Sequence, residues 1–252
     1  MKTPVLVFVD GIDGSGKSTL VESLQERFLD EDYHHYEKYE HAIKAYSFPS
    51  RNPEPHEKAD PLGRTLFHIN DFYQTMRESR GRADYRIFDR SFVSTMAYQG
   101  FYTKYGKSKT NTHFETAFTL GSEALLSQHI PHDINTPKDV YFVHVRCDPE
   151  KAASRVAGRN TRMQNLFGVE DKRDDVDRIE KHEDRVQRLE MLQDRFDLCY
   201  AYLRLNVGAD FDKYRRVTHI VLDSTDKDPD QLLEAATEEL KPFIWPAQRS
   251  ML

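Results

Sequence analysis

Short apolar runs separated by longer amphipathic stretches recur along the chain. Four of these runs are rich in β-branched and aromatic residues and are bounded by polar turns, which predicts buried strands at 5–9, 85–89, 139–146 and 217–223. A weaker fifth candidate, at 44–48, stops just before Pro49. Continuous apolar runs of this kind are typical of parallel strands that are covered on both faces.

Helical periodicity fills the intervals between the predicted strands. Over 184–205, apolar residues recur at spacings of three and four, which predicts a helix that packs one face on a sheet. The residues of that face are Leu189, Leu192, Phe196, Cys199 and Leu203. A similar stripe, formed by Leu20, Leu24 and Phe28, follows a glycine-rich turn. Strands that alternate with helices predict an α/β fold with a parallel sheet covered on both faces.

Three polar stretches interrupt this pattern, at 50–62, 102–112 and 159–182. We interpret them as loops or insertions within a single domain that spans 1–252. The chain shows no internal repeat and no low-complexity tract, and its 252 residues with 38% hydrophobic content suffice for one core.

Charge and cysteine content narrow the class of protein. The net charge of −6 argues against a broad face for polymeric nucleic acid. Two cysteines, Cys147 and Cys199, are too few for a disulfide framework and fit a reducing cytoplasm. The apolar run near the N-terminus is too short for a signal peptide or a membrane span. We therefore expect a cytoplasmic protein with no membrane partner.

The glycine-rich turn carries the strongest chemical signal in the chain. Residues 11–18, Gly11-Ile12-Asp13-Gly14-Ser15-Gly16-Lys17-Ser18, fit the P-loop pattern G-x-x-x-x-G-K-[ST] without a mismatch, and Thr19 follows. The glycines let backbone N–H groups turn towards phosphate oxygens, Lys17 reaches the β- and γ-phosphates, and Ser18 supplies a hydroxyl ligand for Mg²⁺. A predicted strand before the turn and an amphipathic helix after it favour an ATP–Mg²⁺ site over a simple connecting loop.

A second motif, "FDRSFVSTMAYQG" at 88–100, begins at the end of a predicted strand and continues into a helix. Asp89 is placed to help hold Mg²⁺ and its water, and Arg90 to project towards a bound phosphate. An isolated Asp-Arg pair is common on protein surfaces, so this motif gains weight only from its context.

That context resembles the thymidylate kinase family. The stretches "DGIDGSGKST", "FPSR", "DRSFVSTMAYQG", "DPEKAASRVAGR" and "DRIEKHEDRVQRLEMLQDRF" follow one another in the order and spacing of that family, from about residue 3 to about residue 240. The resemblance implies a P-loop NTPase fold with a five-stranded parallel sheet, flanking helices and a LID insertion at about 156–182. It also implies transfer of the ATP γ-phosphoryl group to dTMP, with Mg²⁺, and a homodimer formed by helices on one side of the sheet.

The resemblance assigns roles to individual residues. Asp13 would meet the deoxyribose 3′-OH, Arg51 and Arg90 the acceptor phosphate, and Phe67 would stack on the base. The remaining residues that it places along the nucleoside pocket are Ser94, Tyr98 and Gln99. An acceptor that is already an ionised phosphate needs cations rather than a carboxylate base, and "FPSR" offers an arginine.

A further catalytic arginine is expected from the LID. Some thymidylate kinases carry an arginine directly after the P-loop acid, whereas this chain has Gly14 there and resembles members that supply the arginine from the LID. Of the five basic residues in 158–178, Arg159 and Arg162 lie nearest the end of the preceding helical pattern. A cation that arrives as the LID closes would offset charge on the transferred group.

Two departures from the family pattern bear on the acceptor base. Thymidylate kinases usually carry Phe-x-x-x-Arg, whose arginine donates to thymine O4, but "FHIND" places Asp71 at that position. An ionised carboxylate accepts hydrogen bonds, which suits cytosine N4 or guanine N1 and N2 better than thymine O4. Ser91 replaces a larger Tyr or His after Asp-Arg, and this change either makes room for another nucleotide or reflects ordinary repacking.

Three functions therefore remain open at this point. The first is a deoxynucleoside monophosphate kinase that acts on dTMP, or on dCMP, dGMP, a modified base or several bases. The second is a kinase for a deoxynucleoside or another small hydroxyl compound, which would need a carboxylate near 47–52 that the sequence lacks. The third is a nucleotide-binding regulatory module, which the intact Lys17, Ser18, Asp89 and Arg90 argue against.

Overall fold

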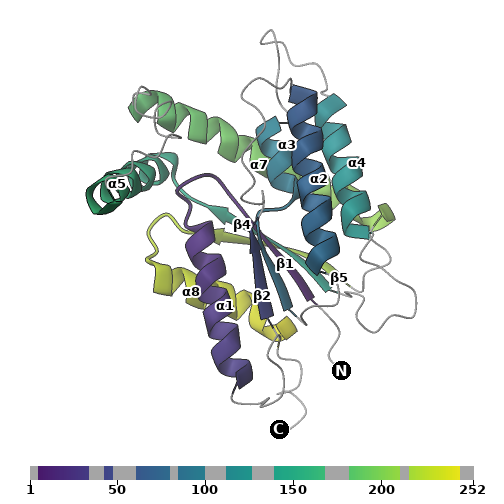
Figure 1. Cartoon of the computed structure of the whole chain (residues 1–252), viewed down its shortest axis with the longest axis horizontal. Helices are drawn as coiled ribbons and strands as arrows, with labels where there is room; N and C mark the ends of the chain where they lie inside the picture. Colours follow the sequence, from purple (N-terminus) through teal and green to yellow (C-terminus); the bar gives the residue numbers. More distant parts are fainter. Residues whose placement is uncertain are drawn as a thin grey trace.

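A computed structural model of the chain places five parallel strands in one sheet, in the order β2-β3-β1-β4-β5 (Figure 1). The strands are β1 (Val5–Asp10), β2 (Ile43–Ser47), β3 (Tyr85–Asp89), β4 (Asp139–Arg146) and β5 (Arg216–Asp223). The structure describes residues 5–33, 43–47, 61–79, 85–99, 112–126, 139–167, 182–210 and 216–244. All five predicted strands are confirmed, including the weak candidate, which forms the edge strand β2.

The strand register brings the carboxyl ends of the central strands to one edge of the sheet. Val9 of β1 lies beside Asp89 of β3, and Asp10 lies beside His144 of β4. In open parallel sheets, ligands bind in the crevice outside this edge. The P-loop and the Asp89-Arg90 motif are therefore brought together by the sheet itself.

Helices cover both faces of the sheet (Figure 1). One face is covered by α1 (Lys17–Tyr33) and α8 (Pro229–Ile244). The other is covered by α2 (Pro61–Ser79), α3 (Phe92–Gln99), α4 (Thr112–Leu126) and α7 (His182–Asp210). Helix α5 (Pro149–Phe167) starts at the sheet and extends away from it. No helix among the described residues is long and apolar enough to cross a membrane.

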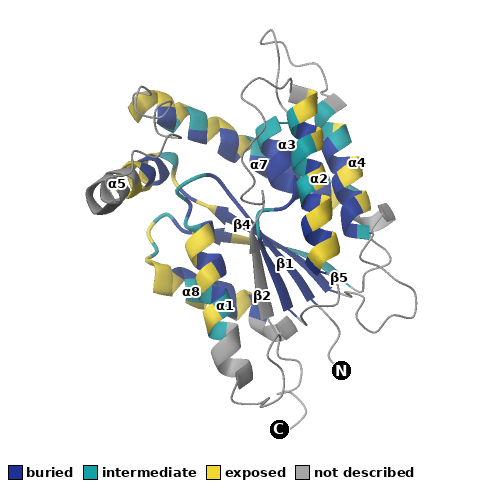
Figure 2. Cartoon of the chain, in the orientation of Figure 1, coloured by how far each residue is buried: buried dark blue, intermediate teal, exposed yellow. Residues whose placement is uncertain are grey.

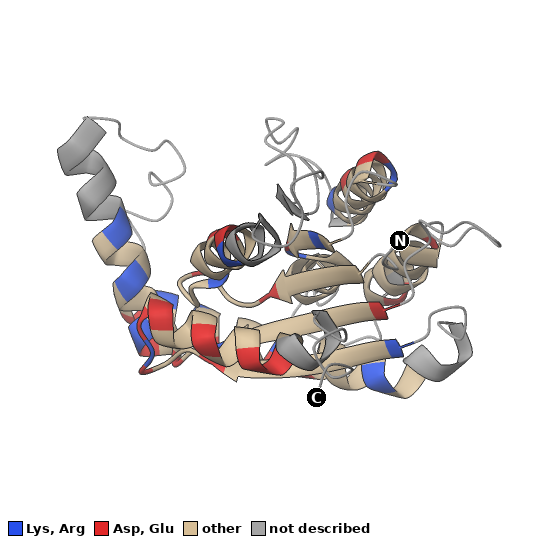
Figure 3. Ribbon diagram, turned by 90° about the horizontal axis from the view of Figure 1, so that it is seen from below, with Lys and Arg blue, Asp and Glu red and all other residues tan. Residues whose placement is uncertain are grey.

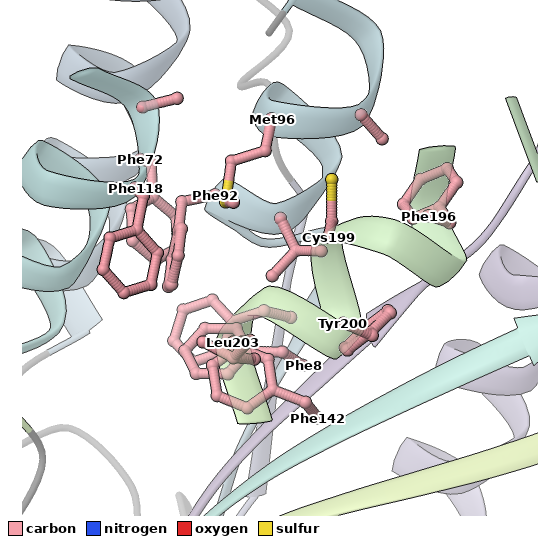
Figure 4. Close-up of a cluster of buried hydrophobic side chains, with 14 of the residues drawn as sticks. Phe8, Phe72, Phe92, Met96, Phe118, Phe142, Phe196, Cys199, Tyr200 and Leu203 are labelled. Atoms are coloured by element: carbon pink, nitrogen blue, oxygen red, sulfur yellow. The ribbon is translucent and has the colours of Figure 1, made fainter. Parts of the chain in front are cut away.

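The core forms two layers because successive strand side chains point to opposite faces. Leu6 and Phe8 of β1 pack towards α2, α3 and α7, whereas Val7 and its alternate neighbours pack towards α1 and α8. The Phe8 ring stacks between Phe88 and Phe142, at centroid distances of 4.8 and 5.2 Å. Figure 4 shows Phe8 and Phe142 beside side chains of α3 and α7, and Figure 2 shows the central strands buried.

Helix α7 confirms the predicted periodic face. Leu189, Leu192, Phe196, Cys199 and Leu203 are all buried, with at most 4% of any of them exposed. Leu20 and Leu24 of α1 are buried as well, while the side chain of Phe28 lies outside the described residues.

The loop predicted for 159–182 is wrong in its first part, because α5 remains helical as far as Phe167. The segment 159–167 contains neither glycine nor proline, and residues such as Arg159 and Met163 favour helix, so only the polar character of the segment suggested a loop. The predicted LID, about 156–182, thus begins inside a helix. The rest of this stretch, with most of 50–62 and of 102–112, lies outside the described residues.

Candidate active site

The P-loop forms the turn between β1 and α1, and two of its glycines adopt a backbone conformation that side chains rarely allow. Gly14 has φ of 84° and Gly16 has φ of 88°. A Cβ atom at Gly14 would also lie 2.3 Å from the carbonyl oxygen of Ala152. An arginine directly after Asp13 would therefore strain this backbone, which gives a structural reason for the glycine there.

Lys17 begins α1 and is almost entirely enclosed, with 6% of the residue exposed. Its Nζ lies 3.4 Å from the carbonyl oxygen of Ile12 and 3.5 Å from Oδ1 of Asp13. Burial and the neighbouring charge of Arg90 lower the pKa of Lys17 to about 8, although Asp13 and Asp89 partly offset them. The ammonium group is thus held inside the loop, where the oxygens of a bound phosphate would balance its positive charge.

Asp89 at the end of β3 meets the P-loop through Ser18. The Ser18 hydroxyl donates to Oδ2 of Asp89 at 2.6 Å, and Oδ1 of Asp89 is buried with no hydrogen-bond partner among the described residues. A buried carboxylate oxygen without a donor, next to a hydroxyl oxygen, is a suitable environment for Mg²⁺, which prefers oxygen ligands and keeps several waters. The donor set present therefore fits this ion.

Arg90 is the only non-glycine residue with positive φ in the described part of the chain, at 85°. Its backbone N–H donates to the carbonyl oxygen of Val9 at 2.9 Å, and its guanidinium donates to Oδ1 of Asp13 at 2.7 Å. Burial raises the pKa of Asp13, but Arg90 and Lys17 outweigh burial and hold that pKa well below its usual range. Two cations and one carboxylate thus face the same space beyond β1 and β3.

Tyr98, at the end of α3, borders this space, and Tyr98 and the next residue, Gln99, are both half-buried. The guanidinium carbon of Arg90 lies 5.2 Å from the centre of the Tyr98 ring, and Tyr98 packs edge-on against Phe196 of α7 at 6.0 Å. The Tyr98 hydroxyl is buried beside Arg90 and Asp13, and burial raises its pKa. The ring thus supports the flat side of the Arg90 guanidinium.

Phe67 and Asp71 lie one turn apart on α2, so they share one side of that helix, and both are half-buried. The Phe67 ring contacts that of His68 at 5.6 Å. Arg51 lies outside the described residues.

Ser94 and Ser91 both donate hydrogen bonds to the buried carboxylate of Asp10. Ser94 was expected along the nucleoside pocket, but it is 3% exposed and donates its hydroxyl proton to Asp10 at 2.5 Å. Ser91 is fully buried and also donates to Asp10, so its small size fits a packed hydrogen-bond cluster rather than extra space for an acceptor.

A cleft of about 420 Å³ opens on the other side of the P-loop. The P-loop from Gly14 through Ser15, Gly16 and Lys17 to Ser18 and Thr19 forms its floor, and Arg155 and Arg159 of α5 form one wall. The opposite wall comes from the segment after β5, between Ser224 and Leu232. The part of α5 that protrudes at the left of Figure 3 carries basic residues, so this cleft suits an anion.

No pattern in the sequence indicated the wall after β5, which is connected to the P-loop by hydrogen bonds of Arg155 and Ser224. Arg155 donates to the carbonyl oxygen of Ser224 at 2.9 Å and to that of Thr225 at 3.3 Å. The Ser224 hydroxyl donates to the carbonyl oxygen of Ser15 at 2.8 Å. Because backbone carbonyls make these contacts, no residue type at the accepting positions reveals them in the sequence.

Of the two expected LID arginines, Arg159 lines the cleft and is exposed. Arg162 lies three residues further along α5, and its side chain is outside the described residues.

The parallel sheet, the P-loop and the acid–arginine turn beside it define a P-loop phosphotransferase. The family model described as thymidylate kinase matches residues 9–193, and the chain belongs to the thymidylate kinase family. Membership of this family makes the protein a nucleoside monophosphate kinase.

Solved structures agree with this fold. A thymidylate kinase from Ehrlichia chaffeensis is 16% identical, with a TM-score of 0.52 over 96% of this chain and 100% of the other. A thymidylate kinase from Candida albicans is also 16% identical, with a TM-score of 0.54 over 96% of this chain and 92% of the other. Comparison with curated proteins gives no significant match.

Proposed function

We propose that this protein transfers the γ-phosphoryl group of ATP to the 5′-phosphate of a deoxynucleoside monophosphate, with dTMP as the default acceptor. The observation that carries this proposal is the meeting of Lys17, Asp13 and Arg90 at one edge of the sheet, between the cleft and the space beside α3. One side suits a triphosphate donor and the other an anionic acceptor.

Each side chain of the site has a role that follows from its position. Lys17 binds the β- and γ-phosphates, and Arg90, together with Arg51, holds the acceptor phosphate and offsets repulsion between the two anions. Asp13 pairs with both Lys17 and Arg90 and so offsets the repulsion between these two cations. In the transfer, the bond from the γ-phosphorus to the bridging oxygen breaks as an acceptor phosphate oxygen forms the new bond in line.

Ser18 and Asp89 would hold Mg²⁺, which neutralises charge on the phosphate oxygens when it is bound. Arg159 lines the donor cleft, and Arg162 follows on the same helix. We expect Arg159→Ala with Arg162→Ala to lower kcat far more than it weakens ATP binding, and an unchanged kcat would assign the catalytic arginine elsewhere.

The acceptor base is a separate question. Phe67 and Asp71 share one side of α2, and a carboxylate beside a stacked base would favour an amino or imino donor. The Candida albicans thymidylate kinase has broad substrate specificity. A second candidate function is therefore a deoxynucleoside monophosphate kinase with altered or broad base preference.

An assay of ADP release with ATP–Mg²⁺ and each deoxynucleoside monophosphate in turn tests both versions. Turnover chiefly with dTMP supports the default acceptor, whereas turnover with dCMP, dGMP or several acceptors supports the second version. Turnover with thymidine but with no monophosphate would replace the proposal by a deoxynucleoside kinase.

We also propose a homodimer. One face of α2 exposes three large apolar side chains, and such a face favours an interface with another chain. These side chains are Leu62, Leu66 and Tyr73, which are 42%, 43% and 40% exposed. Light scattering of the purified protein tests this proposal, and a monomeric mass at micromolar concentration would reject it.

A further inference from the structure

The last residue of β1, Asp10, has a fully buried side chain that contacts neither the cleft nor the space beside α3. Its carboxylate accepts four hydrogen bonds. Oδ1 accepts from the backbone N–H of Ser91 at 2.9 Å and from the Ser94 hydroxyl at 2.5 Å. Oδ2 accepts from the Ser91 hydroxyl at 2.5 Å and from the Tyr200 hydroxyl at 3.0 Å. A carboxylate that is so fully satisfied is a structural anchor rather than a group available to substrate.

Ser91 links this anchor to the start of α3. Its hydroxyl donates to Asp10 and also accepts from the backbone N–H of Val93 at 3.0 Å, as a helix N-cap does. Both donors of Ser91, the backbone N–H and the hydroxyl, therefore point to Asp10. The residue directly after Arg90 is thus fixed to the end of β1.

Arg90 itself needs such fixing because its φ of 85° is unfavourable for a residue with a side chain. Backbone conformations of this kind persist only where the surroundings impose them. Here the N–H of Arg90 is bonded to Val9 and the next N–H, of Ser91, to Asp10. These two consecutive contacts set the orientation of the turn, and the turn directs the guanidinium to Asp13.

We propose that Asp10 is a positioning residue for Arg90: through the backbone N–H and the hydroxyl of Ser91 it holds the turn in the conformation that presents the Arg90 guanidinium to the acceptor phosphate. This role rests on the proposed function, in which Arg90 binds that phosphate. Tyr200, on α7, donates the fourth hydrogen bond to the same carboxylate but does not contact the turn, so it contributes to the stability of the cluster.

The test compares Asp10→Asn, Arg90→Ala, the double variant and a control, Tyr200→Phe. The amide in Asp10→Asn keeps the shape of the side chain, but it replaces one acceptor oxygen by a donor that faces hydroxyls. KM for the acceptor and for ATP are measured for each protein, together with the acceptor dissociation constant by calorimetry. Tyr200→Phe removes one hydrogen bond from the same carboxylate and should change neither KM.

We expect Asp10→Asn to raise the acceptor KM roughly tenfold and to leave the KM for ATP within about twofold. In the Arg90→Ala background the same change should alter acceptor affinity by less than about twofold, because the group that Asp10 positions is gone. Equal effects of Asp10→Asn in both backgrounds, or an equal rise in both KM values, would show a merely structural role and overturn the proposal.

If Asp10→Asn does not fold, the comparison is made with Ser91→Ala, which removes one of the two contacts between Ser91 and Asp10, and the same outcomes decide. Wild-type turnover is measured first. Its absence with every monophosphate overturns the proposed function and this role together, whereas normal wild-type turnover with additive variants overturns only the positioning role.

Discussion

Gly14 of the P-loop and Gly158 of α5 differ in what a side chain would meet. At Gly14 a methyl group would lie 2.3 Å from a backbone oxygen and φ is 84°, whereas at Gly158, inside α5, nothing lies within 4 Å of the added atom. We therefore expect Gly14→Ala to lower the free energy of unfolding by about 1–3 kcal/mol. Gly158→Ala should instead stabilise it by about 0.5–1 kcal/mol.

Urea denaturation of the two variants and the wild type measures this contrast. Gly158→Ala is the matched control, since both variants add one methyl group. A Gly14→Ala protein as stable as the wild type would mean that the P-loop backbone relaxes without cost.

The lowered pKa of Lys17 should make nucleotide affinity depend on pH. Its pKa of about 8 means that the free enzyme carries the ammonium charge below pH 8 and loses it above. Because phosphate binding needs that charge, ADP affinity should fall by about twofold between pH 7 and 8 and by up to about tenfold per pH unit above pH 8. Calorimetric titration of ADP across this range gives the answer, and constant affinity up to pH 10 would contradict the lowered pKa.

At this scale the sequence was informative where a fixed spacing encodes the chemistry. The P-loop pattern identified Lys17 and Ser18 directly, and Asp89-Arg90 came from its place after a strand. Asp10 could not be found in this way, because its partners Ser91 and Tyr200 are distant in the chain and only the fold brings them together. The expected pocket role of Ser94 came from the family resemblance alone.

Helix α5 is connected to the segment after β5 by Arg155, and this connection has its own testable consequence. The Arg155 guanidinium donates to carbonyl oxygens of Ser224 and Thr225 and lines the cleft. Removing it takes one donor from each of these carbonyls, although Ser224 keeps the backbone N–H of Lys227, and frees one cleft wall. We expect Arg155→Ala to raise the KM for ATP about fivefold to tenfold and to leave the acceptor KM unchanged.

Lys151→Ala is the control for this change. Lys151 lies one turn earlier on α5 and pairs with Asp226 of the same segment, but that pair is exposed to solvent. The control should keep the wild-type KM for ATP. A similar rise in both variants would attribute the effect to the whole of α5 rather than to the Arg155 contacts.

Elements were predictable where hydrophobic periodicity was strong. The strands and the long helix α7 show clear apolar patterns, and their bounds were found to within a few residues. The continuation of α5 to Phe167 was missed because the sequence of its last turns is largely polar, so their helical preference is local and leaves no apolar stripe.

Across the molecule, β4, β5 and α7 are joined by a stack of rings that is sensitive to acid. The Tyr200 ring stacks on His144 at 4.7 Å and on His219 at 4.3 Å. Burial lowers the pKa of His144 to about 3, helped by His219 and Arg146, and burial lowers the pKa of His219 to about 4. Both imidazoles are therefore neutral in the folded protein, and the carboxylate of Asp197, 3.7 Å from His144, forms no ion pair with it.

The sign of the resulting pH dependence follows from these lowered pKa values. The unfolded chain binds protons on these histidines as the pH falls below 6.5, whereas the folded protein does so only near pH 4 and 3. Stability is fully present above pH 6.5 and is lost below it. For the fully buried His144 we expect a loss of about 2 kcal/mol between pH 6.5 and 5.

Urea denaturation at a series of pH values, for the wild type and His144→Gln, isolates this contribution. The variant cannot take up the proton, so its stability should depend less on pH over that interval. Identical slopes for the two proteins would show that other groups cause the acid sensitivity.

The overall architecture was the most predictable feature, since alternating strands and helices together with one P-loop leave few arrangements of a parallel sheet. The donor side of the site followed from it. The acceptor side was less accessible to sequence reasoning, because its residues come from α2, α3 and the segment around Arg51 and meet only in three dimensions.

The central position of β1 affects how the protein is made. Val5 pairs with Tyr85 on one side and with Asp139 on the other, so β1 cannot complete its pairing until β4 has also been synthesised. Until β3 and then β4 leave the ribosome, the apolar residues 5–9 have unpaired strand edges on the nascent chain. We therefore expect these residues to need shielding during translation, and the strand that they form later leads directly into the P-loop.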